Sequence, residues 1–316
     1  MLILNSSETA RALSRSALVN ALRKAFREGC DAPLRHHHSI QVPNEANASL
    51  LIMPAWQSGK YLGIKNVMVV PENKRRGKPA VAASYLLYSA LSGELLALID
   101  GEELTNRRTA AASALASSYL SREDSSHLLV IGAGGLAPHL VEAHCNVRPI
   151  RKVSIWARDI EKSRALAASI SIEGVRINAI EELHTGCSHA DIISSATLSE
   201  APLILAKNVV AGTHIDLVGA FTPNMRESDD ELIRTSTLFA DTFEGALVEG
   251  GDYVQPLEAS IIAPNDIVAD LYSLTKQQHL GRRYNQEITV FKSTGTALED
   301  LAAGILAFEA SVATAS

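Results

Sequence analysis

The chain has 316 residues, of which 47% are hydrophobic and 20% charged, and its formal net charge is −6. This length suits two domains of a globular protein, and the acidic balance gives no reason to expect nucleic acid or an anionic membrane as partner. No apolar run approaches the roughly 18 residues needed to span a bilayer. The start of the chain lacks a basic, then apolar, signal segment, and three scattered cysteines (Cys30, Cys145, Cys187) fit no disulfide or metal pattern. We therefore expect a cytoplasmic protein with free thiols.

The first third of the chain changes character near Arg35. Ser6 or Ser7 can cap a helix that runs to about Glu28, where Gly29 ends it. Between Arg35 and Ile99, short apolar runs alternate with turn residues, which predicts strands of a mixed or antiparallel sheet. The runs lie at 49–53, 61–64 and 67–70, and 73–78 is a basic loop.

A helix rich in Ala and Ser, Leu104 to Leu120, links this region to a regular alternation of strands and helices. Such alternation predicts a parallel sheet with helices on both faces. The strands are expected at 128–131, 153–156, 175–177, 191–195, 214–218, 237–240 and 288–292, and the helices at 137–145, 160–170 and near 180–184.

No strand follows the final Ala-rich helix, Thr296 to about Ala310, so it does not connect two strands of the second region. We therefore expect it to pack against the first region. The predicted fold is therefore α/β, a Rossmann-type doubly wound sheet plus a discontinuous α+β domain. We expect the discontinuous domain at 1–118 and 293–316 and the dinucleotide-binding domain at 119–292.

The most specific motif is a glycine-rich turn. The apolar strand Leu128 to Ile131 runs directly into Gly132-x-Gly134-x-x-Ala137, and a helix-compatible stretch follows. Gly132 permits the tight turn, Gly134 lets a pyrophosphate approach the backbone, and Ala137 lets the helix pack closely on the strand. The free N–H groups of the helix start would then face the anion. The pattern predicts a dinucleotide site.

The choice of cofactor depends on the end of the next strand, Trp156-Ala157-Arg158-Asp159. A carboxylate there binds the ribose hydroxyls of NAD, whereas an arginine accommodates the 2′-phosphate of NADP. Ala157 occupies the acceptor position and Arg158 follows it, so NADPH is favoured. A shift of one residue would make Asp159 the carboxylate of an NAD site, and NADH stays possible. The residues expected to contact the cofactor are Thr109, Gly132, Gly134, Gly135, Leu136, Ala137, Trp156, Arg158, Ser195, Ala196, Thr197 and Val218.

Three cationic side chains lie at positions where a charge requires a structural or functional explanation. Lys65 lies within the apolar stretch 61–68, and an unpaired buried ammonium is costly, so it either reaches solvent or meets an anion. Arg108 lies near the start of a helix of small residues, where a cation opposes the helix dipole and an anionic ligand is indicated. Arg35 precedes His36-His37-His38, to which we assign no metal because adjacent strand residues point to opposite faces. Each cation alone is more typical of a structural or surface charge; together they form a candidate clamp for a small carboxylate.

The chain resembles the ornithine cyclodeaminase/mu-crystallin family along almost its whole length. Four segments carry the resemblance: Gly63-Ile64-Lys65, the stretch Asp100 to Ala111 with its Leu-Thr-x-x-Arg-Thr-Ala-Ala pattern, the Gly132 to Ala137 turn, and Phe291-Lys292-Ser293-Thr294-Gly295-Thr296-Ala297-Leu298-Glu299-Asp300. The resemblance implies that Arg35, Lys65 and Arg108 hold the substrate carboxylate, and that the discontinuous domain forms a homodimer. The family includes cyclodeaminases, alanine dehydrogenases and ketimine reductases, so membership leaves the reaction open.

Phe221 separates these reactions. Members that act as cyclodeaminases or alanine dehydrogenase carry an aspartate at this position, and both reactions need a carboxylate to handle a proton near an imine. Phenylalanine cannot do this, and Asp216 lies at an odd offset within a strand, so it faces the wrong way. Reduction of a preformed cyclic ketimine does not need such a carboxylate, and the apolar phenylalanine ring suits the methylene groups of the substrate. Around Phe221-Thr222-Pro223 the chain is most similar to 1-pyrroline-2-carboxylate reductases of hydroxyproline catabolism.

The expected activity is NAD(P)H-dependent reduction of 1-pyrroline-2-carboxylate to L-proline, and of 1-piperideine-2-carboxylate to L-pipecolate. Lys65, Arg108 and Arg35 are the expected catalytic residues, and Phe221 and Gly295 are expected to line the pocket for the small cyclic imino acid. Lys65, or a water that it holds, is the candidate proton source. Ornithine cyclodeaminase, alanine dehydrogenase and a non-enzymatic NADPH or small-molecule binder of the mu-crystallin type remain as alternatives.

Overall fold

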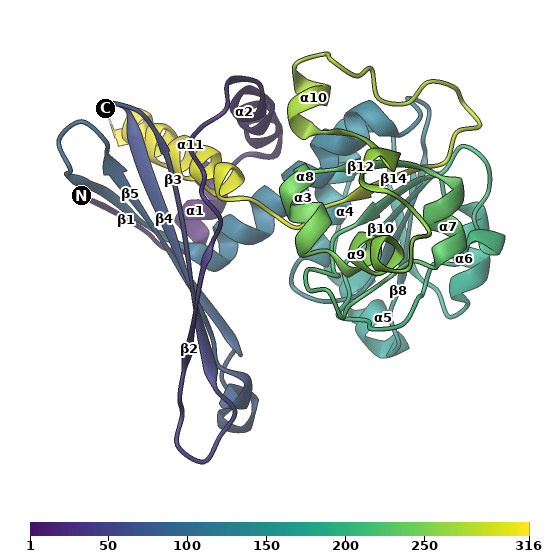
Figure 1. The fold of residues 1–316 in the computed structure, drawn as a ribbon, viewed down its shortest axis with the longest axis horizontal. Coiled ribbons are helices and arrows are strands. Elements are labelled where there is room, and N and C mark those ends of the chain that lie inside the picture. Colours follow the sequence, from purple (N-terminus) through teal and green to yellow (C-terminus); the bar gives the residue numbers. More distant parts are fainter. Residues whose placement is uncertain (316) are drawn as a thin grey trace. The chain divides into compact units, whose positions relative to one another are not determined.

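The structure, a computed structural model, describes residues 1–315, apart from the side chains of Lys74 and Ala315. Its internal contacts divide the chain into two units (Figure 1), one formed by Met1–Arg108 with the segment from Thr296 onward, the other by Thr109–Gly295. The sequence predicts these junctions at 118/119 and 292/293 instead. Helix α3 (Gly101–Leu120) continues through the first junction.

A six-stranded sheet forms the first unit. Its order is β1-β6-β5-β4-β3-β2, with β1 parallel to β6 and the other neighbours antiparallel. The runs expected at 61–64 and 67–70 are one strand, because Lys65 and Asn66 between them pair with both neighbouring strands. The strands are β1 (Leu2–Leu4), β2 (His36–Ile40), β3 (Ala48–Gln57), β4 (Tyr61–Val69), β5 (Val81–Ser89) and β6 (Leu95–Asp100).

The helices of the first unit are α1 (Ser6–Ala12), α2 (Arg15–Glu28) and α11 (Ala297–Ala315), and the 3-10 turn η1 (Pro71–Arg76) lies in the expected basic loop. The single helix expected from Ser6 to Glu28 is therefore wrong. The chain breaks at Ser14, whose extended backbone starts α2, and serine favours such a cap over a helix interior. Asn5, rather than Ser6 or Ser7, caps α1 in a reciprocal box with Glu8. Helix α11 packs against α2, β3 and β4, which ties the end of the chain to its beginning.

An eight-stranded, fully parallel sheet forms the second unit, in the order β13-β12-β14-β11-β10-β7-β8-β9. The chain reverses direction across the sheet between β7 and β10, and the crevice outside this point is where open α/β sheets bind ligands. The strands are β7 (His127–Ile131), β8 (Lys152–Trp156), β9 (Arg176–Ala179), β10 (Ile192–Ser195), β11 (His214–Leu217), β12 (Thr237–Ala240), β13 (Ile267–Asp270) and β14 (Thr289–Lys292). Only β13 among them was not expected.

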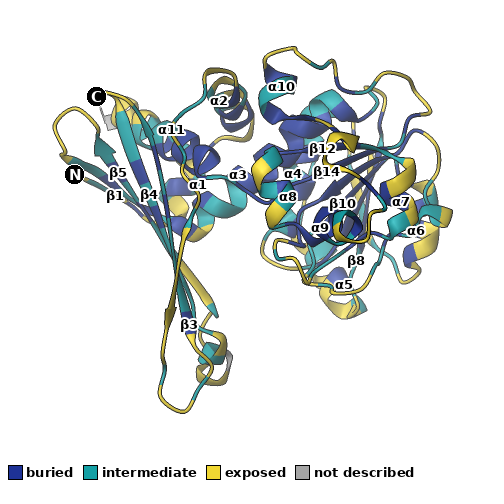
Figure 2. Ribbon diagram, viewed as in Figure 1, coloured by how far each residue is buried: buried dark blue, intermediate teal, exposed yellow. Residues whose placement is uncertain are grey.

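Helices cover both faces of this sheet, as its alternating sequence predicted (Figure 1). They are α4 (Ala137–Val147), α5 (Ile160–Ser169), α6 (Leu183–His189), α7 (Asp230–Thr235), α8 (Phe243–Val248), α9 (Gly251–Glu258) and α10 (Leu271–Thr275), with 3-10 turns η2 (Ala206–Asn208) and η3 (Pro264–Asp266). Alternate strand residues enter two separate apolar cores, one on each face. Figure 2 shows the central strands of this unit buried, whereas β2 of the first unit is exposed along its length. Among the described residues, no helix combines the length and apolarity that crossing a bilayer requires.

Candidate active site

A cleft of about 760 Å³ opens at the carboxyl edge of the parallel sheet, at the reversal between β7 and β10. Its walls come from the three loops that follow β7, β8 and β10. The predicted cofactor residues that line it are Gly132, Gly134, Trp156, Arg158, Ala196 and Thr197. The other predicted cofactor residues, Thr109, Gly135, Leu136, Ala137, Ser195 and Val218, are not among its lining residues.

The glycine turn has the geometry that a pyrophosphate needs. Gly132 has φ +114°, and a Cβ there would lie 2.6 Å from the carbonyl oxygen of Ala196, so only glycine fits between the loops after β7 and β10. A Cβ on Gly134 would meet no atom within 4 Å, which leaves open space over the backbone. Ala137 begins α4 and is buried against the strand. This turn fits a dinucleotide phosphate approaching the start of α4.

Two exposed cations face the cleft, Arg158 just after β8 and Lys162 in the first turn of α5. Arg158 and Lys162 both line the cleft, and neither forms a hydrogen bond or ion pair with another described residue. Asp159 also lines the cleft, but its carboxylate accepts the Glu161 N–H at 3.1 Å and caps α5. The Trp156 indole donates to the Glu181 carbonyl at 3.0 Å, which fixes its ring beside the cleft.

In the first unit, the three predicted cations come together. Lys65 points from β4 toward α11 and pairs with Asp300 at 2.8 Å, so it meets an anion rather than solvent. Arg108 pairs with Asp300 at 2.8 Å and with Glu299 at 2.6 Å. Arg35 is half-buried, and its charge acts on both Lys65 and Asp300. Helix α3 begins at Gly101, so Arg108 lies well inside the helix, and the expectation that it opposes the helix start was wrong; carboxylates on α11 account for it.

Burial and neighbouring charges tune this cluster. Desolvation, then the charge of Arg108, lowers the pKa of Lys65 to about 8. Burial would raise the pKa of Asp300, but Arg108 and Lys65 outweigh it and hold that pKa below its ordinary value. Lys65 and Arg108 thus share the carboxylate of Asp300, and the charge of Arg35 reaches the same pair.

The remaining predicted pocket residues lie at the carboxyl ends of two adjacent strands. Phe221 follows β11 and is 49% exposed. Gly295 follows β14, has φ +78°, and donates its N–H to Asp241 at 2.6 Å. Asp216, by contrast, is fully buried within β11, where it accepts a hydrogen bond from Ser194 and lies 3.4 Å from His144. It therefore does not share the position of Phe221.

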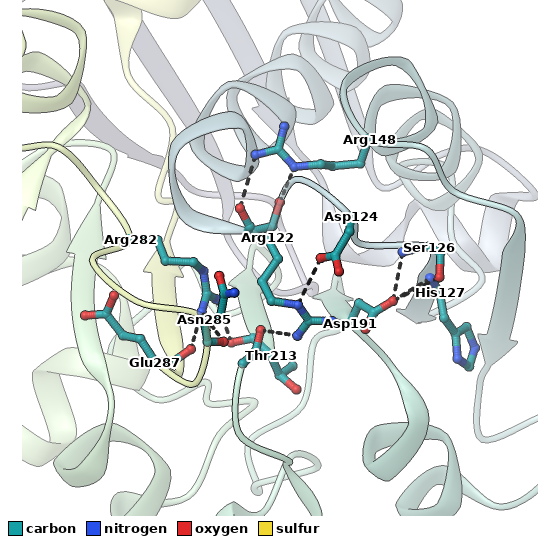
Figure 3. Close-up of polar contacts among 12 residues, drawn as sticks. Arg122, Asp124, Ser126, His127, Arg148, Asp191, Thr213, Arg282, Asn285 and Glu287 are labelled. Carbon is teal, nitrogen blue, oxygen red and sulfur yellow. Dashed lines mark hydrogen bonds and ion pairs between the residues drawn. The ribbon is translucent and has the colours of Figure 1, made fainter.

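The opposite, amino-terminal edge of the parallel sheet carries an arginine-rich network (Figure 3). Asp191 accepts the N–H groups of Ser126 and His127 and pairs with Arg122 at 2.6 Å. Arg148 donates to the last carbonyls of α3, including that of Ser117, where a cation complements the helix dipole. This edge anchors the starts of the strands and leaves their carboxyl ends for ligand chemistry.

Sequence reasoning missed the buried acidic residues that organise both sites. Glu299 and Asp300 hold two of the three cations, and Glu227 and Asp241 hold loops at the carboxyl edge of the parallel sheet. Tyr85 was also missed; its hydroxyl is buried near Asp300 and has no hydrogen-bond partner among the described residues. The signal available was the pair Glu299-Asp300 at the start of an otherwise apolar helix.

Comparison with known proteins identifies the family. The model of the ornithine cyclodeaminase/mu-crystallin family matches residues 1–314. An uncharacterised protein of Schizosaccharomyces pombe is 49% identical over 303 residues, 92% of each chain. The Delta(1)-pyrroline-2-carboxylate reductase of Colwellia psychrerythraea is 34% identical over 96% of this chain and 97% of its own.

Two solved structures share the whole fold. The Thermococcus litoralis Delta(1)-pyrroline-2-carboxylate reductase, in complex with NADH and L-proline, is 34% identical and superposes with a TM-score of 0.92 over 100% of this chain and 98% of its own. An archaeal alanine dehydrogenase dimer with bound NAD is 28% identical, with a TM-score of 0.91 over 100% and 97%. The chain therefore belongs to the ornithine cyclodeaminase/mu-crystallin family.

Proposed function

We propose that this protein reduces cyclic ketimines with NAD(P)H, converting 1-pyrroline-2-carboxylate to L-proline and 1-piperideine-2-carboxylate to L-pipecolate. The observation that carries the proposal is the cluster of Arg35, Lys65 and Arg108, whose cationic side chains, two of them buried, suit a small carboxylate. The relatives named as Delta(1)-pyrroline-2-carboxylate reductases support the same reaction.

The chain's own residues would bind, orient and protonate the substrate. A bound nicotinamide supplies the hydride that adds to the imine carbon. Arg108 and Lys65 hold the carboxylate and thereby fix the imine carbon in place, and such positioning supplies most of the acceleration. The C=N bond also needs one proton on nitrogen. Lys65, whose pKa is about 8, or a water that it holds, is our candidate donor.

Phe221 separates this reaction from cyclodeamination and from alanine dehydrogenation, which need a carboxylate near the imine. The aromatic side chain is exposed at the carboxyl edge of the sheet, where an apolar surface suits the methylene groups of a five- or six-membered ring. Asp216 cannot replace the missing carboxylate, because it is buried with Ser194 and His144.

We further propose that NADPH is the preferred cofactor. Arg158 and Lys162 offer two cations to the cleft beside Trp156, where the adenosine ribose of a dinucleotide lies in such folds. Asp159 caps α5 with one carboxylate oxygen and also lines the cleft, so the proposed preference for NADPH rests on the two cations.

We also propose a homodimer that acts in the cytoplasm, in the breakdown of hydroxyproline or related amino acids. The NAD-bound dimer of the archaeal alanine dehydrogenase supports the assembly. Cys30, Cys145 and Cys187 are not joined by disulfides in the described residues, which suits a reducing compartment.

The decisive experiment follows the loss of reduced-nicotinamide absorbance with purified protein, 1-pyrroline-2-carboxylate, and NADPH or NADH in parallel. Rapid oxidation with formation of proline is expected. No oxidation with either cofactor, but ammonia and proline from L-ornithine and NAD, would return the chain to the cyclodeaminases. Tight NADPH binding without turnover of any ketimine would instead indicate a binding protein.

A further inference from the structure

One fully buried carboxylate, that of Glu227, lies directly behind the cleft. Its Oε1 accepts the hydroxyl of Ser195 at 2.6 Å and both the N–H and the hydroxyl of Thr197 at 2.7 Å. Its Oε2 accepts the N–H of Gly219 at 2.8 Å. Four donors thus converge on one side chain that no solvent reaches. An ionised carboxylate only accepts hydrogen bonds, so the arrangement matches its charged form.

These bonds join the ends of two adjacent strands. Ser195 ends β10, and Gly219 follows β11. A Cβ on Gly219 would lie 2.1 Å from the carbonyl oxygen of Thr197, so the two loops approach as closely as their backbones allow. Thr197 lines the cleft, and Phe221 donates its N–H to the Gly219 carbonyl at 3.0 Å. The position of Glu227 therefore sets that of a cleft wall and of the proposed substrate-side phenylalanine.

A second buried layer holds Glu227 itself. Asp252, in the first turn of α9, accepts the backbone N–H groups of Glu227 and Ser228 at 2.8 and 3.0 Å. Lys292, the last residue of β14, pairs with Asp252 at 3.2 Å, and both side chains are fully buried. The lysine of the C-terminal Phe-Lys-Ser-x-Gly motif is thus linked through Asp252 to the cleft wall.

The electrostatics of this layer make Glu227 sensitive to change. Burial, then the charge of Asp252, raises the pKa of Glu227, while Lys292 and the hydroxyl of Ser195 oppose that rise. A glutamine in its place would set its own amide N–H group against some of these donors, and the loops that carry the donors would have to shift.

The order of the strands in the sheet indicates which half of the cofactor would lie against these loops. A dinucleotide crosses from the first half of such a sheet to the second, so its adenosine end lies over β7 and β8 and its nicotinamide half lies toward β10 and β11. Thr197 and Gly219 belong to the second half.

We infer that Glu227 is a positioning residue for the nicotinamide half of the cofactor, acting through Thr197 and Gly219. The inference rests on the proposed nicotinamide dinucleotide as ligand of the cleft, and it assigns Glu227 no contact with the reacting atoms.

The matched pair of variants is Glu227→Gln and Asp216→Asn. Asp216 is an equally buried carboxylate that accepts from Ser194, the neighbour of Ser195, but on the opposite face of the same sheet. Calorimetric titration with NADH and with ADP-ribose, which lacks the nicotinamide, separates the two ends of the cleft. Melting temperatures of both variants measure the purely structural cost.

Glu227→Gln should weaken NADH binding about tenfold to a hundredfold, the loss typical of a hydrogen bond to a charged group, and leave ADP-ribose binding unchanged. Asp216→Asn should lower the melting temperature and leave both ligands unchanged. Equal weakening of NADH and ADP-ribose by Glu227→Gln, or no weakening, overturns the inference.

If Glu227→Gln fails to fold, Thr197→Val serves instead, because it removes one of the four donors. It should weaken NADH binding by a smaller factor and leave ADP-ribose binding unchanged, whereas equal weakening of both ligands would count against the inference. These titrations need no turnover. A wild-type protein that binds NADH but reduces no ketimine would refute the proposed function and leave this inference intact.

Discussion

Removal of the two exposed cations that line the cleft offers a quantitative test of cofactor preference. Arg158 and Lys162 are exposed at the cleft, so each contact with a 2′-phosphate resembles an ion pair in water and contributes at most about 1 kcal/mol. Together they contribute at most about 2 kcal/mol, which corresponds to at most roughly a 30-fold change in dissociation constant. The double variant Arg158→Ala/Lys162→Ala should therefore bind NADPH more weakly by up to about 30-fold, and each single variant by up to about fivefold.

The assay is titration of each variant with NADPH and NADH at low and high salt. NADH binding should not change, and the loss for NADPH should shrink as salt screens the exposed charges. Arg164→Ala is the matched control, because Arg164 lies on α5 with Lys162 but pairs with Glu161 and Glu181 and does not line the cleft. An equal loss for both cofactors would refute the assignment to a 2′-phosphate, and weakening of NADH by Asp159→Asn would point to an NAD-type ribose site.

Three further predictions concern the two units. Lys65→Ala and Arg108→Ala should sharply lower kcat/KM for 1-pyrroline-2-carboxylate while titration shows NADPH affinity unchanged; equal loss of NADPH affinity would contradict a substrate role. Because the role proposed for Lys65 needs its charged form and its pKa is about 8, kcat/KM should fall about tenfold per pH unit above that value. A decline that persists in Lys65→Arg would belong to another group. Burial alone would raise the pKa of Asp191, but the N–H groups of Ser126 and His127 outweigh burial, so the pKa is lowered in the folded protein. The ionised carboxylate therefore stabilises the fold fully at pH values above the ordinary carboxyl pKa, and this stabilisation is lost as the pH falls through the lowered pKa of the folded state. Asp191→Asn should thus lower the unfolding free energy at neutral pH by about 1.5–3 kcal/mol, measured by denaturant titration, with the difference shrinking in acid; a constant difference would show that charge plays no part.

Most of the parallel sheet was predictable because its strands other than β13 are local sequence patterns. Continuous apolar runs bounded by helices mark buried parallel strands, and the glycine turn marks the first of them. Strand β13 escaped prediction because Ile267–Asp270 is short and follows a proline turn, so little local periodicity distinguishes it from a loop. The break before α2 escaped because Leu13 continues the apolar face, which hides the cap at Ser14.

The cations of the site were predictable only in part. A lysine inside an apolar strand signals a buried partner, but the partner of Lys65 lies 235 residues away, on α11. No periodicity links positions so distant in the chain. The same holds for Glu227, whose donors come from loops that only the sheet order brings together.

The buried acids have a common physical role that links the sequence motif to the proposed chemistry. A loop at the end of a parallel strand has backbone N–H groups with no strand partner, and buried N–H groups must be satisfied. The Asp241 carboxylate accepts the backbone N–H groups of Thr294 and Gly295. The Glu227 carboxylate likewise accepts those of Thr197 and Gly219. Because each carboxylate binds several donors at once, the loops move only if a charge is left unpaired in the core, which is costly. The carboxyl edge that lines the proposed cofactor cleft is thereby held rigid by these acids, a role separate from the carboxylate binding that we propose for Lys65 and Arg108.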